Sequence, residues 1–127
     1  MISLPSSVRV FLHEPATDLR KGFDALCGLV TSAFGQDPTS GHLFLFVNRR
    51  RDRMKILYWD RDGLAIWYKR LEIGSFQIPA TATKAASIEM TATQLTLILS
   101  GIDLRSARQR RRYQRPISAA ENRMFPS

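Results

Sequence analysis

The chain has 127 residues, the size of one domain, and 44% of them are hydrophobic, which excludes an intrinsically disordered protein. Its formal net charge of +8 and isoelectric point of about 10.6 favour a polyanionic partner. The single cysteine, Cys27, excludes an internal disulfide and a cysteine-based zinc site. No apolar stretch approaches about 18 residues and the first residues do not resemble a signal peptide, so we expect a cytoplasmic, nucleoid-associated protein with no membrane contact.

A strand and a helix are the first two predicted elements. Residues 8–12 (VRVFL) are apolar at every position except Arg9, which is typical of a short strand. Apolar residues then recur at a spacing near 3.6 between residues 19 and 34, which predicts an amphipathic helix packed on a sheet. Its inward face is expected to consist of Leu19, Phe23, Leu26, Val30, and Ala33 or Phe34.

The ends of this helix also have sequence signals. Thr17 or Asp18 can cap its first turn, and Gly35 is the expected end. Gly22 and Gly28 weaken a helix, so we expect them to permit close packing against the sheet.

Three apolar runs between residues 42 and 71 predict an antiparallel meander. Residues 43–47 are apolar at every position, which places this strand in the centre of the sheet. The second run, 56–59, is followed by Asp62-Gly63, a pair that supplies residues with positive φ to a tight hairpin. The third run, 64–71, alternates, with Leu64, Ile66 and Tyr68 on one face.

A capping box at residues 91–94 (TATQ) predicts a helix over 92–100 that ends at Gly101. Ile88–Met90 just before it is either a short strand or a hydrophobic staple. The predicted fold is therefore α+β, with a small, mainly antiparallel sheet of about four strands in a single domain, residues 1–104. Residues 105–127 are rich in arginine and poor in apolar residues, so we expect a basic, flexible tail.

The strongest candidate binding site is the cationic turn between the first two strands of the meander. Arginine side chains match phosphate oxygens in a bidentate geometry, which favours binding to a nucleic-acid backbone. The alternative is a solvated turn without a ligand. The turn holds Arg49, Arg50, Arg51 and Arg53, with Lys55 just inside the next strand, and further expected contacts are Arg61, Lys69, Arg70, Arg108, Arg110, Arg111 and Arg112.

Aromatic residues on the neighbouring strands are a second candidate. Aromatic rings beside arginine can stack on nucleic-acid bases, but residues at this spacing more often form the core of a sheet. The set consists of Tyr58, Trp59, Trp67 and Tyr68. We expect core packing on one face and keep Tyr58 and Tyr68 as candidate exposed contacts.

A catalytic site is the third candidate. Clustered carboxylates can hold Mg²⁺, as in nucleases, and the acidic residues to consider are Asp18, Asp24, Asp52, Asp60, Asp62 and Glu72. Caps, turns and neutralisation of nearby cations explain most of them. His13 and His42 are isolated, and no hydrolase, phosphate-loop or dinucleotide motif is present. We therefore expect no enzymatic activity, metal or cofactor, and a metal-dependent nuclease is the last alternative.

Several segments resemble one known family. They are DLRKGFDAL at 18–26, GHLFLFVNRRRDRMKILYWDRDG at 41–63, YKRLEIGSF at 68–76 and LTLILSGIDL at 95–104. Together they resemble the TnpB accessory proteins of the IS-sixty-six family of bacterial insertion sequences. The resemblance implies a small partner of a separate transposase, needed for efficient transposition, and implies no catalytic residues.

The expected function is thus that of a non-catalytic accessory protein for DNA transposition that binds backbone phosphates. Its expected partners are DNA, at the element ends or the target, and the transposase of the same element. The alternative is an adaptor that docks on the transposase without contacting DNA.

Overall fold

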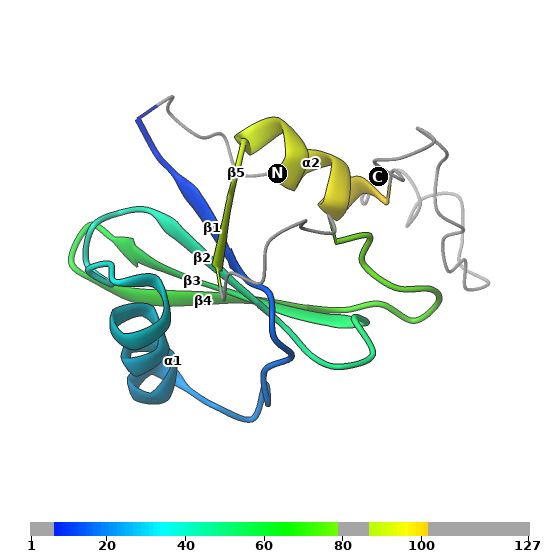
Figure 1. Ribbon diagram of the computed structural model, residues 1–127, viewed down its shortest axis with the longest axis horizontal. Coiled ribbons are helices and arrows are strands. Elements are labelled where there is room, and N and C mark those ends of the chain that lie inside the picture. Colours follow the sequence, from blue (N-terminus) through cyan, green and yellow to red (C-terminus); the bar gives the residue numbers. More distant parts are fainter. Residues whose placement is uncertain (1–6, 79–86, 102–127) are drawn as a thin grey trace, which may run out of the picture.

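The computed structural model describes residues 7–78 and 87–101 (Figure 1). These residues form an α+β fold, as predicted. The elements in chain order are β1 (Val10–His13), α1 (Phe23–Leu29), the π-helical segment η1 (Val30–Phe34), β2 (Leu43–Val47), β3 (Arg53–Asp60), β4 (Gly63–Arg70), β5 (Ser87–Met90) and α2 (Ala92–Ser100).

The sheet has five strands in the order β4-β3-β2-β1-β5. The meander β2-β3-β4 is confirmed, and the buried β2 lies in the centre of the sheet, as predicted. The prediction of about four mainly antiparallel strands needs correction, because β1 pairs with β2 in parallel and β5 adds a strand antiparallel to β1. The helical crossover between β1 and β2 permits the parallel pairing, since parallel neighbours require a long connection.

A helix covers each face of the sheet (Figure 1). On one face, α1 and η1 pack over a cluster that includes Phe11, Phe44 and Leu57. On the other face, Leu95 and Ile98 of α2 pack over side chains of β1, β2 and β3. The helix α2 has the predicted bounds and the predicted capping box, in which Thr91 accepts from the Gln94 backbone N–H and Gln94 accepts from the Thr91 N–H. No helix within the two described ranges is both long enough and apolar enough to cross a membrane.

The predicted helix 19–34 is shorter and less regular than expected. Its first turn begins at Phe23 with Gly22 as the N-cap, and no side chain caps it, because Asp18 accepts hydrogen bonds from Arg20 instead. Leu19 is buried from a turn outside the helix, and Phe23 is 47% exposed, so its assignment to the inward face was wrong.

The end of this helix differs in a second way. After Leu29 the helix widens into η1, which places the Phe34 ring 5.4 Å from that of Phe44 and 5.9 Å from that of Phe46. Gly35 ends the helix in the left-handed conformation, as predicted, with φ of 62°.

Two predictions about local backbone geometry were wrong. Gly22 and Gly28 do not permit close packing, because a Cβ atom added at either position would meet nothing within 4 Å. In the β3–β4 turn the residue with positive φ is Arg61, at 56°, and not Asp62 or Gly63. Asp60 pairs with Gly63, so the turn has two central residues, and positive φ at the first of them suits the twist of a hairpin.

Candidate nucleic-acid interface

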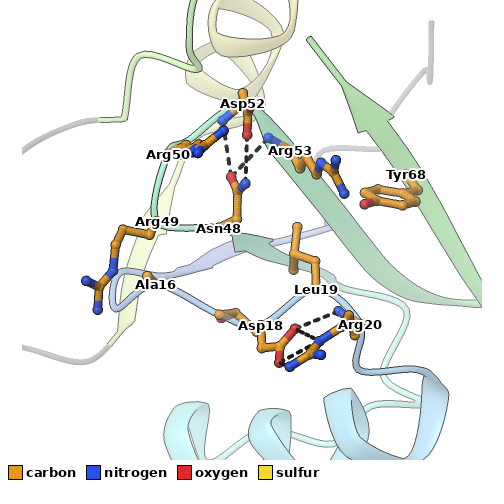
Figure 2. A pocket seen from close by; sticks show the side chains of 11 residues that line it. Ala16, Asp18, Leu19, Arg20, Asn48, Arg49, Arg50, Asp52, Arg53 and Tyr68 are labelled. Carbon is orange, nitrogen blue, oxygen red and sulfur yellow. Dashed lines mark hydrogen bonds and ion pairs between the residues drawn. The ribbon is translucent and has the colours of Figure 1, made fainter.

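The cationic turn, residues 48–53, is organised by the side chain of Asn48. Its Oδ1 accepts hydrogen bonds from the backbone N–H groups of Asp52, at 3.1 Å, and Arg53, at 3.0 Å. Its Nδ2 donates to the Asp52 carboxylate at 2.7 Å, as Figure 2 shows. Asparagine therefore takes the place of backbone partners in a turn that does not close as a regular two-residue hairpin.

The segment after β4 holds the same turn from its other side. The Leu71 N–H donates to the Asp52 carbonyl at 2.7 Å, and the Phe76 N–H donates to the Arg51 carbonyl at 2.6 Å. Phe76 is itself buried in the core beneath α2. The backbone of the turn is thus fixed to the core, while the side chains of Arg49, Arg50 and Arg51 remain exposed.

A hollow of about 530 Å³ lies between the cationic turn and the segment that precedes α1 (Figure 2). The Thr17 N–H donates to the Val47 carbonyl at 2.8 Å, which fixes this segment beside the end of β2. The hollow is lined by Ala16, Thr17, Asp18, Leu19, Arg20, Asn48, Arg49, Arg50, Asp52, Arg53 and Tyr68.

The acidic side chains of the hollow already have partners. The Arg20 guanidinium donates to the Asp18 carboxylate at 2.7 Å, and hydrogen bonds from Arg20 lower the pKa of Asp18 to about 2. The Asp52 carboxylate accepts from Asn48. Among the described residues, by contrast, no ion-pair partner faces the guanidinium groups of Arg49, Arg50, Arg51 and Arg53. The hollow therefore presents unneutralised positive charge.

The other predicted cationic contacts occupy different places. Lys55 Nζ donates to the Lys21 carbonyl at 2.9 Å and lies over the Tyr68 ring, 5.0 Å from its centroid. Arg70 pairs with Glu72 at 2.9 Å. Lys69 is exposed on the opposite face of the sheet from Tyr68, since neighbouring residues of a strand alternate.

Arg61 is not part of the hollow. It lies at the opposite end of the β3–β4 hairpin, roughly 25 Å away along an eight-residue strand. The tail arginines Arg108, Arg110, Arg111 and Arg112, and the predicted tail 105–127 as a whole, lie outside the described residues.

The aromatic residues divide between core and surface. Tyr58 and Trp67 pack against the core on the α2 face, so the expectation that Tyr58 is an exposed contact was wrong. Trp59 donates its indole N–H to the Arg61 carbonyl at 3.1 Å. Tyr68 is 48% exposed and lines the hollow.

The carboxylates considered for catalysis are dispersed. Asp60 and Asp62 lie in the far turn, Asp60 at its start and Asp62 at its second central position. Asp18, Asp52 and Glu72 instead contact Arg20, Asn48 and Arg70, respectively. Across residues 7–78 and 87–101, no three His, Cys, Asp or Glu side chains come together in a way that could hold a metal ion. His42 Nδ1 accepts from the Arg9 N–H at 3.0 Å, and His13 is buried against Phe34 and Phe46.

Sequence reasoning found the cationic turn but missed Asn48 and the wall formed by residues 16–20. The signal for Asn48 was an asparagine directly after a buried strand, four residues before an aspartate, which is typical of side-chain-stabilised turns. The wall had no such signal, because its position depends on the long-range bond between Thr17 and Val47.

Comparison with known proteins identifies the family. The family model described as IS66 Orf2 like protein matches residues 8–109. The chain belongs to this family. The IS66 Orf2-like proteins are accessory, non-catalytic proteins of an insertion sequence, and the match includes every described element and the whole of the cationic turn.

Two relatives come from Sinorhizobium fredii (strain NBRC 101917 / NGR234). The uncharacterized protein y4jC is 33% identical over 103 residues, which are 81% of this chain and 86% of that protein. The uncharacterized protein y4hO is 36% identical over 104 residues, or 80% of this chain and 89% of that protein. No solved structure matches the chain.

Proposed function

We propose that this IS66 Orf2-like protein binds DNA during transposition, holding backbone phosphates with the arginines of the cationic turn. The observation that carries the proposal is a turn whose backbone is fixed by Asn48 and Phe76 while its arginine side chains stay exposed and unpaired within the described residues. A fixed backbone lowers the entropic cost of ordering these side chains on a ligand. Their charge supplies the attraction to phosphates.

Such contacts position a protein on DNA without reading its sequence. Each neutralised phosphate releases condensed counterions and contributes about 0.9 to the slope of log affinity against log salt on duplex DNA. The variant Arg49→Ala/Arg50→Ala should therefore weaken binding to unrelated duplexes by a similar factor and flatten this slope by roughly 2. Fluorescence anisotropy with labelled duplexes over a range of salt concentrations measures both quantities.

The matched control is Arg9→Ala/Arg61→Ala, which removes the same charge at the opposite end of the sheet. Arg61 lies just after the last residue of β3. Arg9 lies just before β1, whose first residue pairs with Leu43 at the start of β2, the end away from the cationic turn. This control should keep a slope close to that of the wild-type protein. If both variants flatten the slope equally, net charge and not the cationic turn accounts for binding.

One observation favours the adaptor as a second candidate. The eight-residue strand β4 is at the edge of the sheet, and in the described part of the chain no strand pairs with its outer side. An open strand of this length can accept a strand from another protein. The test is whether the purified protein binds the transposase of its own element without DNA. Binding that is unaffected by Arg49→Ala/Arg50→Ala would support docking at a surface other than the cationic turn.

A further inference from the structure

Neither packing in the core nor binding of phosphates explains the position of the Tyr68 ring. It is 48% exposed on the edge strand β4, whereas Trp67 beside it packs against the core. Its cross-strand neighbour Lys55 lies over the ring, with Nζ 5.0 Å from the centroid, and is held there by the Lys21 carbonyl. Lys55 thus covers one face of this exposed ring, so a base would stack on the other face.

The ring also shares the hollow with the exposed arginines. Figure 2 shows Arg53 extending toward Tyr68 on one side of the hollow and Arg49 and Arg50 on the cationic turn. The volume of about 530 Å³ lies in the range of small-molecule sites, about 300–1,000 Å³, and exceeds what one phosphate group would fill. Cationic side chains beside an exposed aromatic ring are the usual composition of a site for single-stranded nucleic acid.

We propose that this hollow accepts one unpaired nucleotide of a DNA strand, with its phosphates on Arg49 and Arg50 and its base stacked on Tyr68. The inference rests on the proposed function and adds a ligand class, namely single-stranded or locally unpaired DNA. In a duplex the bases are stacked on one another and do not present a free face to a protein ring.

The polar groups of the hollow indicate little base selectivity. Asn48 and Asp52 bond to each other and to the turn backbone, and Asp18 is paired with Arg20. Few groups therefore remain to read the edge of a base, whereas stacking tolerates any base. We expect similar affinity for unrelated single strands of equal length.

The test compares Tyr68→Ala and Tyr68→Phe on three labelled ligands measured by fluorescence anisotropy. The ligands are a mixed-sequence single strand, the corresponding duplex, and a strand of the same length that carries abasic sugar-phosphates in place of nucleotides. Tyr68→Ala should weaken binding of the single strand by about 5- to 150-fold, the range measured when a stacking residue is truncated. It should change binding of the duplex and of the abasic strand by less than about 2-fold, since neither offers a free base. Tyr68→Phe keeps the ring and should bind the single strand almost as well as the wild-type protein.

Phe23→Ala is the matched control, because Phe23 is 47% exposed and does not line the hollow. It should leave binding of all three ligands unchanged. An equal effect of Tyr68→Ala on single strand, duplex and abasic strand, or no effect on any of them, would overturn the inference.

The two proposals fail in distinguishable ways. If Arg49→Ala/Arg50→Ala weakens binding to the duplex and the abasic strand but Tyr68→Ala leaves the single strand unaffected, backbone binding stands and the base site is wrong. If the arginine variant binds every ligand as the wild-type protein does, the proposed function itself is wrong.

Discussion

Asn48 shows how one side chain can organise a charged turn. Its amide makes three hydrogen bonds, two with backbone N–H groups and one with the Asp52 carboxylate. The three consecutive arginines, residues 49–51, repel one another and their exposed side chains gain little from packing, so the turn needs the hydrogen bonds of Asn48 to keep one conformation. The arginines bear the charge that would bind a ligand, and the hydrogen bonds of Asn48 fix the position of the backbone that carries it.

We expect Asn48→Ala to lower the free energy of unfolding by about 1–3 kcal/mol, because it removes the partner of two backbone N–H groups in a partly buried turn. Urea unfolding at pH 7 measures the change. Arg50→Ala is the control, because it alters an exposed side chain of the same turn and should change stability by no more than about 0.5 kcal/mol. An Asn48→Ala variant as stable as Arg50→Ala would show that the turn keeps its conformation without the amide.

At the scale of elements, some structure could be predicted from local sequence and some could not. The capping box located the start of α2, and the unbroken apolar run 43–47 located the central strand, because each signal acts within a few residues. The first helix was predicted too long. The apolar periodicity of the sequence extends back to Leu19, but Leu19 reaches the core from a turn. The widened turns of η1 depend on contacts between Phe34 and the sheet. Tertiary packing set these bounds.

Substitution by alanine should have opposite effects on stability at Gly28 and Gly35. Gly28 is exposed inside α1 with nothing within 4 Å of an added Cβ, so Gly28→Ala should stabilise the protein by about 0.5–1 kcal/mol. Gly35 has φ of 62° at the helix end, so Gly35→Ala should cost about 1–2 kcal/mol. Thermal or urea unfolding of the two variants measures the difference. A loss of stability in Gly28→Ala would contradict the expected gain in helix propensity at this position.

At the scale of the whole molecule, the described positive charge is distributed unevenly along the sheet. The exposed arginines of the cationic turn gather at one end, while Arg9 at the other end is paired with Glu89 at 2.6 Å. Composition predicted a basic protein, and the sequence located the arginine run. The position of Arg61 at the far end follows from the predicted antiparallel meander, whose successive turns lie at opposite ends of the sheet. The sequence did not show that Tyr68 faces a hollow, because the second wall of that hollow, residues 16–20, is placed by the long-range bond between Thr17 and Val47.

Repulsion within the cationic turn should lower the free energy of unfolding of the protein at low salt. Three consecutive exposed arginines repel one another, and the repulsion acts over about 30 Å at 0.01 M salt but only about 3 Å at 1 M. We therefore expect Arg49→Ala/Arg50→Ala to be more stable than the wild-type protein at 0.01 M salt, by about 0.5 kcal/mol, and equally stable at 1 M. Urea unfolding at the two salt concentrations measures this.

Arg9→Ala/Arg61→Ala removes the same net charge but breaks the pair with Glu89, so it should show no gain at low salt. The same substitutions that stabilise the free protein are those expected to weaken DNA binding, as for residues retained for function at the expense of stability. A cationic-turn variant that is less stable than the wild-type protein at low salt would show instead that these arginines contribute to the fold.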